Sequence, residues 1–268
     1  SADHHNLLPS PPRLSSDLPG DRHTGGSSTG LSPAMADFGP QSAYLGEAGR
    51  AYHEGKRALP PGALPWVARA RAELFQPHLD ETAAVFEWGC GFGWNLGGLR
   101  CSRRVGFDIA PELESSVRSA GVEFVHDPAE LTPASFDVVL CHHALEHVPD
   151  PWRVLRELRR LAKSDGRLLL AVPFEQERRY RRFNPAEPNH HLFSWNVQTL
   201  GNLATAAGWR CENIGLRRYG YDRRAAQIAV RFRVGERGFR AIRTVLQRVI
   251  PLYEIALIGR PHLDPQLT

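Results

Sequence analysis

A glycine-rich turn follows a short apolar segment in the first half of the chain. Residues 84–95 read AVFEWGCGFGWN, so Glu87 is followed by glycines at every second position, Gly89, Gly91 and Gly93. An apolar run bounded by glycines predicts a buried strand that enters a tight turn. Glycine is needed there if φ is positive or if a ligand lies against the main chain. Residues 104–108 form a second short strand pattern that ends in an acid, Asp108. This layout is typical of an open α/β sheet that holds an adenosine by its ribose hydroxyls.

The spacing of the glycines disfavours a dinucleotide as the ligand. The dinucleotide motif G-x-G-x-x-G needs a small third residue, but Trp94 or Leu96 occupies that position. Glu87 would also repel a pyrophosphate, whereas it suits a cationic ligand. S-adenosylmethionine (SAM) carries an adenosine, an ammonium group and a sulfonium but no phosphate, so SAM fits this turn better.

Several ordered motifs resemble those of the class I SAM-dependent methyltransferases. The Glu87-to-Gly93 pattern resembles their first motif, residues 126–131 their acid-containing turn after the third strand, and residues 135–151 their fourth strand with a Leu-Glu-His loop. The similarity extends over roughly residues 60–260. It implies a doubly wound, seven-stranded, mostly parallel α/β sheet with helices on both faces. It also implies SAM as the cofactor and S-adenosylhomocysteine as the product, but it leaves the acceptor open.

The resemblance assigns a residue to each part of the cofactor. Glu87 and the glycines would hold the methionine end, Asp108 the ribose and Asp127 the adenine, because charged acceptors make strong hydrogen bonds. The alternatives are a solvated loop acid at Asp108 and a simple turn at Asp127. The predicted cofactor-binding residues are Glu87, Gly89, Gly91, Gly93, Asp108, Ile109, Asp127, Pro128, Cys141 and His142.

Histidines follow the fourth and fifth predicted strands, where ligands of open α/β sheets bind. His142 and His143 end the fourth strand pattern, and His191 follows a basic, proline-broken segment that should form a loop over the acceptor site. A neutral imidazole can take the proton from an acceptor hydroxyl or ammonium. We therefore expect His143 and His191 to be catalytic. The alternative is that these rings only bond the backbone or pack in the pocket.

A metal site is a second hypothesis for the same histidines. Some quinone-biosynthesis O-methyltransferases and some enzymes that modify the 3′ end of small RNAs carry Glu-x-x-Glu-His here and bind a divalent metal. This chain has His143, Glu146 and His147, with His191 further on. On a helical turn the first three would share one face, and such a set suits Zn, Mn or Fe better than Mg. Alternatively, Glu146 and His147 only hold the loop, so metal binding stays open.

Alternating strand and helix patterns position these motifs. Strands are predicted near residues 83–88, 103–108, 122–126, 136–141, 167–173, 209–216 and 253–259, and helices near 64–79, 94–101, 111–120, 150–163 and 195–207. Residues 222–250 are arginine-rich, amphipathic and predicted to be helical. Residues 1–34 lack apolar periodicity and are expected to be a disordered leader or an appended segment, with the natural start at Met35. The methyltransferase domain would then span residues 35–268, with a cap loop at about 174–194.

Charge, apolar content and cysteine spacing indicate which kinds of partner the protein is expected to bind. The 268 residues carry a net charge of +4, and no apolar run reaches the roughly 18 residues of a membrane helix. The four cysteines are not paired in a C-x-x-C motif, which favours a reduced, cytoplasmic protein. The arginine clusters could contact phosphates, but a solvated basic face is the default. We therefore expect a small-molecule acceptor, no membrane partner, little role for nucleic acid, and a monomer or homodimer.

The sequence thus predicts a SAM-dependent methyltransferase that acts on an O or N nucleophile of a small metabolite. Two alternatives remain: a metal-dependent RNA 2′-O-methyltransferase, and a SAM-binding protein without transferase activity. A nicotinamide-dependent oxidoreductase is disfavoured by Trp94.

Overall fold

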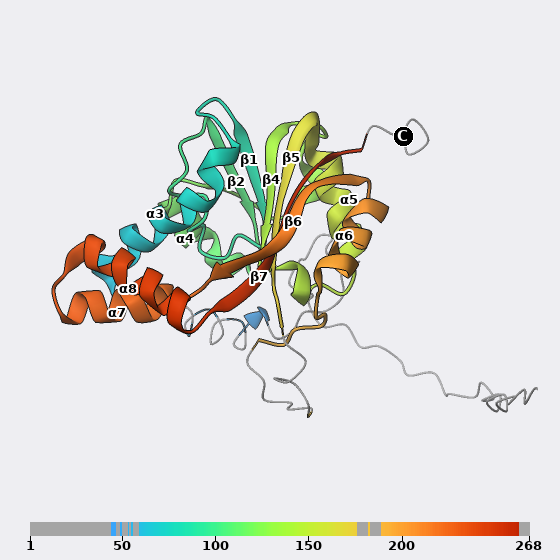
Figure 1. The fold of residues 1–268 in the computed structure, drawn as a ribbon. Helices are drawn as coiled ribbons and strands as arrows, with labels where there is room; N and C mark the ends of the chain where they lie inside the picture. The colour runs from blue at the N-terminus through green and yellow to red at the C-terminus, as the bar shows by residue number, and fades with distance from the viewer. Residues whose placement is uncertain are drawn as a thin grey trace, which may run out of the picture. The chain divides into compact units, whose positions relative to one another are not determined.

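Figure 1 shows the computed structural model of the chain. It describes residues 44–46, 49, 53, 55, 59–175, 182 and 189–262. Contacts divide the chain into two units, Ser1–Leu31 and Ser32–Thr268, and everything below concerns the second. The expectations for residues 1–34 lie outside the described residues, as does most of the predicted cap loop at 174–194.

A seven-stranded sheet forms the centre of the described unit, in the order β3-β2-β1-β4-β5-β7-β6. The first five strands are parallel, and β7 pairs antiparallel with both β5 and β6. The order reverses between β1 and β4, which creates the crevice where open α/β sheets bind ligands. The predicted doubly wound, mostly parallel sheet is confirmed. The strands are β1 (Ala84–Trp88), β2 (Arg103–Phe107), β3 (Glu123–Val125), β4 (Phe136–His142), β5 (Ala162–Pro173), β6 (Trp209–Tyr219) and β7 (Leu252–Pro261).

Helices cover both faces of the sheet (Figure 1). One buried cluster joins Phe86 and Val139 to Leu155 and Leu200 of α5 and α6, and a second joins Val85 to helices α3 and α4. Parallel strands buried on both faces explain why their sequences are almost continuously apolar. The helices are α3 (Leu64–Phe75), α4 (Glu114–Ser119), α5 (Pro151–Leu161), α6 (Val197–Ala206), α7 (Asp222–Arg231) and α8 (Gly235–Val249). Short 3-10 turns occupy Pro61–Ala63, Gln76–His78, Pro111–Leu113, Pro128–Glu130 and Leu145–His147.

The helix predicted at 94–101 is wrong, because this segment forms a series of turns. Two adjacent glycines weaken a helix by roughly 1 kcal/mol each. Gly98 also lies so close to α3 that an added β-carbon would stand 2.9 Å from Ala72 Cβ and 3.0 Å from Ala68 O. The glycines therefore allow the loop to pack directly on α3 instead of forming a helix.

The predicted helical region 222–250 is a hairpin of two helices inserted between β6 and β7. The positive φ angles of Arg233 (54°) and Gly235 (63°) reverse the chain between α7 and α8. On its inner side, Ala226 and Phe239 pack with Val67 of α3. Asp222 reinforces this contact, since its carboxylate accepts from Arg71 Nε at 3.1 Å and from Arg243 Nε at 2.7 Å. No helix in the described part of the chain is long and apolar enough to cross a bilayer.

Candidate functional site

A cavity of about 930 Å³ opens at the carboxyl ends of the central strands. Its wall includes the glycine turn after β1, the acid after β2 and the histidines at the end of β4. The start of α7 and the first residues of β7 complete the wall from the other side. The cavity therefore occupies the crevice at which the strand order reverses. Among the predicted cofactor-binding residues, Gly89, Gly91, Asp108, Ile109 and His142 lie in this wall.

The glycine turn presents bare main chain to the cavity. Gly89 and Gly91 have φ angles of 71° and 53°, which side-chain-bearing residues rarely adopt. Gly89 N and Cys90 N both donate to Phe107 O, at 2.8 and 2.9 Å, which fixes the turn against the end of β2. A β-carbon on Gly91 would meet no atom within 4 Å. The glycine thus leaves space above the turn where a ligand can approach.

Asp108 links the glycine turn to the loop after β2. Its Oδ2 accepts from Gly91 N at 2.8 Å and its Oδ1 accepts from Ala110 N at 3.1 Å. A carboxylate offers about four acceptor positions, so these two bonds are compatible with further bonds to ribose hydroxyls. The turn and the acid therefore fit an adenosine ligand without a phosphate.

Glu87 lies beneath the turn and outside the cavity wall. Its side chain is fully buried, and burial raises the pKa of the carboxyl to about 8, although the hydrogen bond from Asn95 opposes this rise. Asn95 Nδ2 donates to Glu87 Oε1 at 2.6 Å, and Asn95 itself lines the cavity. The structure thus places Glu87 as a support of the turn through Asn95 and does not bring its carboxyl into the wall.

Four other predicted cofactor residues also lie outside the wall: Gly93, Asp127, Pro128 and Cys141. Asp127 is buried and its Oδ1 accepts from Ala129 N at 2.9 Å, so it caps the turn Pro128–Glu130. Cys141 is fully buried within β4, and burial raises the pKa of its thiol well above the ordinary range. The adenine role of Asp127 stays a prediction.

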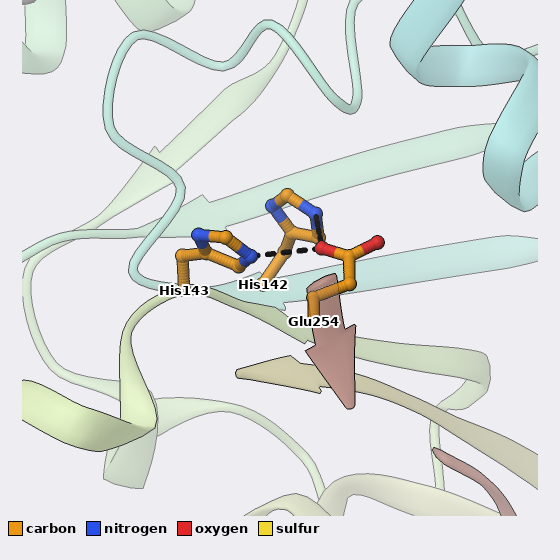
Figure 2. Close-up of side chains that lie close together, drawn as sticks. All are labelled: His142, His143 and Glu254. Atoms are coloured by element: carbon orange, nitrogen blue, oxygen red, sulfur yellow. Dashed lines mark hydrogen bonds and ion pairs between the residues drawn. The ribbon is translucent and has the colours of Figure 1, made fainter. Parts of the chain in front are cut away.

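His142 and His143 converge on Glu254, an acid that the sequence reasoning missed (Figure 2). His143 Nε2 lies 2.8 Å and His142 Nε2 3.5 Å from Glu254 Oε2. The positive φ of His143, 54°, turns its ring toward His142, so that the two rings stack with centroids 4.5 Å apart. Arg217 Nε donates to the other carboxylate oxygen at 2.7 Å.

Glu254 is fully buried on β7 and remains ionised. Burial raises the pKa of its carboxyl, but hydrogen bonds and charge interactions with His142 and His143 outweigh burial and hold the pKa well below its usual range. A carboxylate can only accept, so the short contact requires a proton on His143 Nε2 and leaves Nδ1 as the basic nitrogen of the neutral ring. A lone acid in the apolar segment LYEIALIG was the one signal in the sequence that could have revealed Glu254.

A second cluster contains Glu146, His147 and His191, which offer donor atoms within 4.8 Å of one another. Tyr44 Oη donates to Asn189 O at 2.6 Å and therefore accepts from His147 Nδ1 at 2.7 Å. His191 Nδ1 lies 2.9 Å from Glu175 Oε1, to which it donates. Both rings thus use Nδ1 as a donor, which leaves Nε2 of each with a lone pair.

The predicted convergence of His143 with Glu146 and His147 is wrong. That expectation assumed one helical turn from residue 143 to residue 147, but only Leu145–His147 forms a turn, of the 3-10 type. The left-handed backbone at His143 directs this ring to Glu254 instead. The four predicted ligands are therefore divided between two clusters on the same cavity wall.

Fold and site together define a class I methyltransferase, the Rossmann-like class that uses SAM as its cofactor. The model of the methyltransferase domain family matches residues 63–214, more than half of the chain, so the chain belongs to this family. The hairpin α7–α8 and strand β7 lie outside the matched region.

Known proteins support the same class. The chain is 39% identical over 132 residues to a ubiquinone biosynthesis O-methyltransferase of Xanthomonas campestris pv. campestris, covering 43% of this chain and 50% of the relative. It thus spans about half the length of the curated relatives that it matches. A methyltransferase of Haloferax volcanii, solved with its activator Trm112, has a TM-score of 0.58 at 18% identity and covers 84% of this chain and 98% of its own. A methyltransferase of Bacillus halodurans has a TM-score of 0.51 at 19% identity and covers 72% and 98%. These structural similarities show the fold alone.

Proposed function

We propose that the protein transfers the methyl group of SAM to an oxygen or nitrogen nucleophile of a small molecule. The observation that carries this proposal is the cavity wall, which includes the glycine turn, Asp108 and His143. Glu254 is buried outside this wall and bonds to His143 Nε2. The O-methyltransferase name of the curated relatives favours an oxygen nucleophile. The cavity volume of about 930 Å³ favours a small acceptor over RNA.

SAM, when bound, supplies a methyl group that its sulfonium already activates for displacement. The chain has to hold the two reactants in line and exclude water, which can contribute several kcal/mol. Gly89, Gly91 and Asp108 would bind the cofactor through main chain and carboxylate. The acceptor would then bind in the cavity beside the histidines at the end of β4.

His143 Nδ1 would take the acceptor proton while the new bond to the methyl carbon forms. Glu254 contributes by holding the proton on Nε2, so that Nδ1 carries the lone pair. The carboxylate also stabilises the imidazolium that results, as an acid beside a catalytic histidine does in other enzymes. Arg217 Nε donates to the other oxygen of Glu254 at 2.7 Å and so fixes the carboxylate in place.

The test combines a methyl-transfer assay with variants of this pair. Labelled SAM is incubated with a panel of phenols, hydroxy acids and amines, and S-adenosylhomocysteine formation is measured. His143→Ala should lower turnover about 10²-fold or more while leaving SAM affinity unchanged. His262→Ala is the matched control, because this exposed histidine lies outside the cavity wall. Normal turnover in His143→Ala would contradict the proposed base. Cofactor binding without transfer to any acceptor would favour a SAM-binding protein that lacks transferase activity.

A divalent metal is a second proposal, supported by the cluster of Glu146, His147 and His191. Histidines that bind a metal usually donate the other ring nitrogen to a neighbouring acceptor. His147 donates to Tyr44 and His191 to Glu175, so both have this arrangement. Two imidazoles and one carboxylate suit Zn, Mn or Fe. A metal bound there would lower the pKa of an acceptor hydroxyl.

His191 is then a ligand or an acceptor-orienting group, and the RNA 2′-O-methyltransferase alternative depends on this metal. Titration of Zn or Mn into chelator-treated protein should show one site, and Glu146→Gln should remove it. An unchanged titration in this variant would refute the site. We also infer from the sequence a cytoplasmic monomer or homodimer.

A further inference from the structure

The helical hairpin α7–α8 exposes most of the large apolar side chains found on the surface of the described residues. Eight of the twelve such exposed side chains lie between residues 228 and 252. Phe232 at the tip of the hairpin is 68% exposed and Val249 at the end of α8 is 72% exposed. Exposed apolar side chains that gather on one part of a protein surface usually mark an interaction site. The eight are Ile228, Val230, Phe232, Val234, Val245, Val249, Ile250 and Leu252.

The same hairpin carries a concentrated positive charge. Residues 222–249 contain eight arginines and two acids, a net charge of +6, whereas the whole chain carries only +4. Both acids are paired with arginines of α3 and α8: Asp222 with Arg71 and Arg243, and Glu236 with Arg69 and Arg240. Six arginines remain exposed and form no ion pair with a described residue: Arg223, Arg224, Arg231, Arg233, Arg237 and Arg248.

Arginines and exposed apolar side chains are neighbours along the hairpin. At the tip, Arg231 and Arg233 flank Phe232, and on α8 Arg248 precedes Val249. The inner side is occupied by the contact of Ala226 and Phe239 with α3. The exposed surface of the hairpin therefore combines apolar groups with uncompensated positive charge, as helices that lie in a membrane interface do.

We propose that the exposed surface of the α7–α8 hairpin binds the surface of a membrane that contains anionic phospholipids. The phosphate groups would neutralise the six arginines, while Phe232 and the aliphatic side chains enter the headgroup region. This peripheral contact needs no spanning segment. It goes beyond the proposed methyl transfer and does not depend on it.

Two other occupants fit the surface less well. RNA would bind the arginines, but the exposed valines and isoleucines offer no stacking surface for bases, and Phe232 is the one aromatic among the eight. A second copy of the chain would bring two hairpins of net charge +6 together, which costs electrostatic energy. An anionic bilayer offers phosphate groups to the arginines and an apolar interior to the exposed apolar side chains.

The hairpin also adjoins the cavity. Asp222 and Arg223 at the start of α7, and Pro251 and Leu252 after α8, lie in the cavity wall. A hairpin bound to lipid would therefore place this side of the cavity next to the membrane surface, where an acceptor with an apolar tail could enter.

Co-sedimentation with vesicles tests the proposal. The full chain should bind phosphatidylcholine vesicles that contain about 30% phosphatidylglycerol, and should bind pure phosphatidylcholine at least about tenfold more weakly. Salt at about 0.5 M should weaken the binding, because it screens the arginines. The double variants Arg231→Glu/Arg233→Glu and Phe232→Ser/Val249→Ser should each lower the partition coefficient about tenfold or more.

The control variant is Trp152→Ser/Arg156→Glu, which removes an exposed aromatic and its neighbouring arginine from α5 and should not change vesicle binding. Circular dichroism and S-adenosylhomocysteine binding show whether each variant folds. Equal binding by the hairpin and control variants would overturn the proposal. Three other results would also overturn the proposal. The first is a lack of binding to anionic vesicles, the second is salt-sensitive binding to RNA but not to vesicles, and the third is a dimer that the hairpin variants dissociate.

Discussion

Replacing Glu87 with glutamine should change how the stability of the protein depends on pH. Burial raises the pKa of this carboxyl from 4.5 to about 8, so the folded chain holds the proton more tightly than the unfolded chain. As the pH rises from 4.5 toward 8, the unfolded chain releases this proton first, and the free energy of unfolding falls. The stability linked to Glu87 is thus fully present below pH 4.5 and is lost as the pH approaches 8.

The size of the effect follows from the two pKa values. A difference of one pH unit in this range corresponds to about 1.36 kcal/mol. Between pH 5 and pH 7 the wild-type protein should therefore lose about 2.5 kcal/mol through Glu87 alone. Glutamine cannot ionise, and its amide oxygen can still accept from Asn95 Nδ2, so Glu87→Gln should not show this loss.

Urea unfolding of both proteins at pH 5, 6 and 7 measures the effect. Contributions from other groups cancel in the difference between wild type and variant, which should change by about 2–3 kcal/mol in favour of the variant. Glu112→Gln, a change at an exposed acid, should leave the wild-type dependence intact. Parallel curves for wild type and Glu87→Gln would refute the conclusion that Glu87 is protonated beneath the turn.

Three further predictions concern the site. Asp108→Ala should weaken S-adenosylhomocysteine binding by about 1.5–3 kcal/mol, measured by calorimetry, because it removes a charged acceptor; an unchanged dissociation constant would exclude Asp108 from the ribose site. Gly89→Ala should lower the free energy of unfolding by about 2–4 kcal/mol, because φ is 71° and the new β-carbon would lie 2.4 Å from Ala144 Cβ. The control is Gly62→Ala, whose new β-carbon would meet no atom within 4 Å, and it should unfold as the wild type does. Glu175→Gln should weaken Zn or Mn affinity about 10–100-fold if Glu175 orients a metal-binding histidine, and equal affinities would argue against that role.

Much of the fold could be predicted because the chain's local patterns agree with its tertiary structure. Apolar runs that end in glycine, in an acid or in histidines marked strands β1, β2 and β4, and these patterns arise from burial on both faces of a parallel sheet. The helix predicted for residues 94–101 does not form, because Gly98 packs closely on α3. This contact joins segments that are distant in the chain, so local sequence patterns do not reveal it.

The candidate site was only partly predictable, for a similar reason. Gly89, Gly91 and Asp108 act close to their own strand ends, so sequence spacing was enough to bring them together. Glu254 meets His143 across 111 positions in the chain, and this meeting depends on the antiparallel placement of β7 beside β5. The division of the histidines into two clusters depends on the left-handed backbone of His143, which residue type alone does not indicate.

Calorimetric titration of S-adenosylhomocysteine into the full chain, with Asp108→Ala alongside, tests the central claim most directly. Binding at one site with a micromolar dissociation constant, weakened at least about tenfold in the variant, is the predicted result. An absence of binding, or equal binding by both proteins, would contradict the assignment of the glycine turn and Asp108 as the cofactor site.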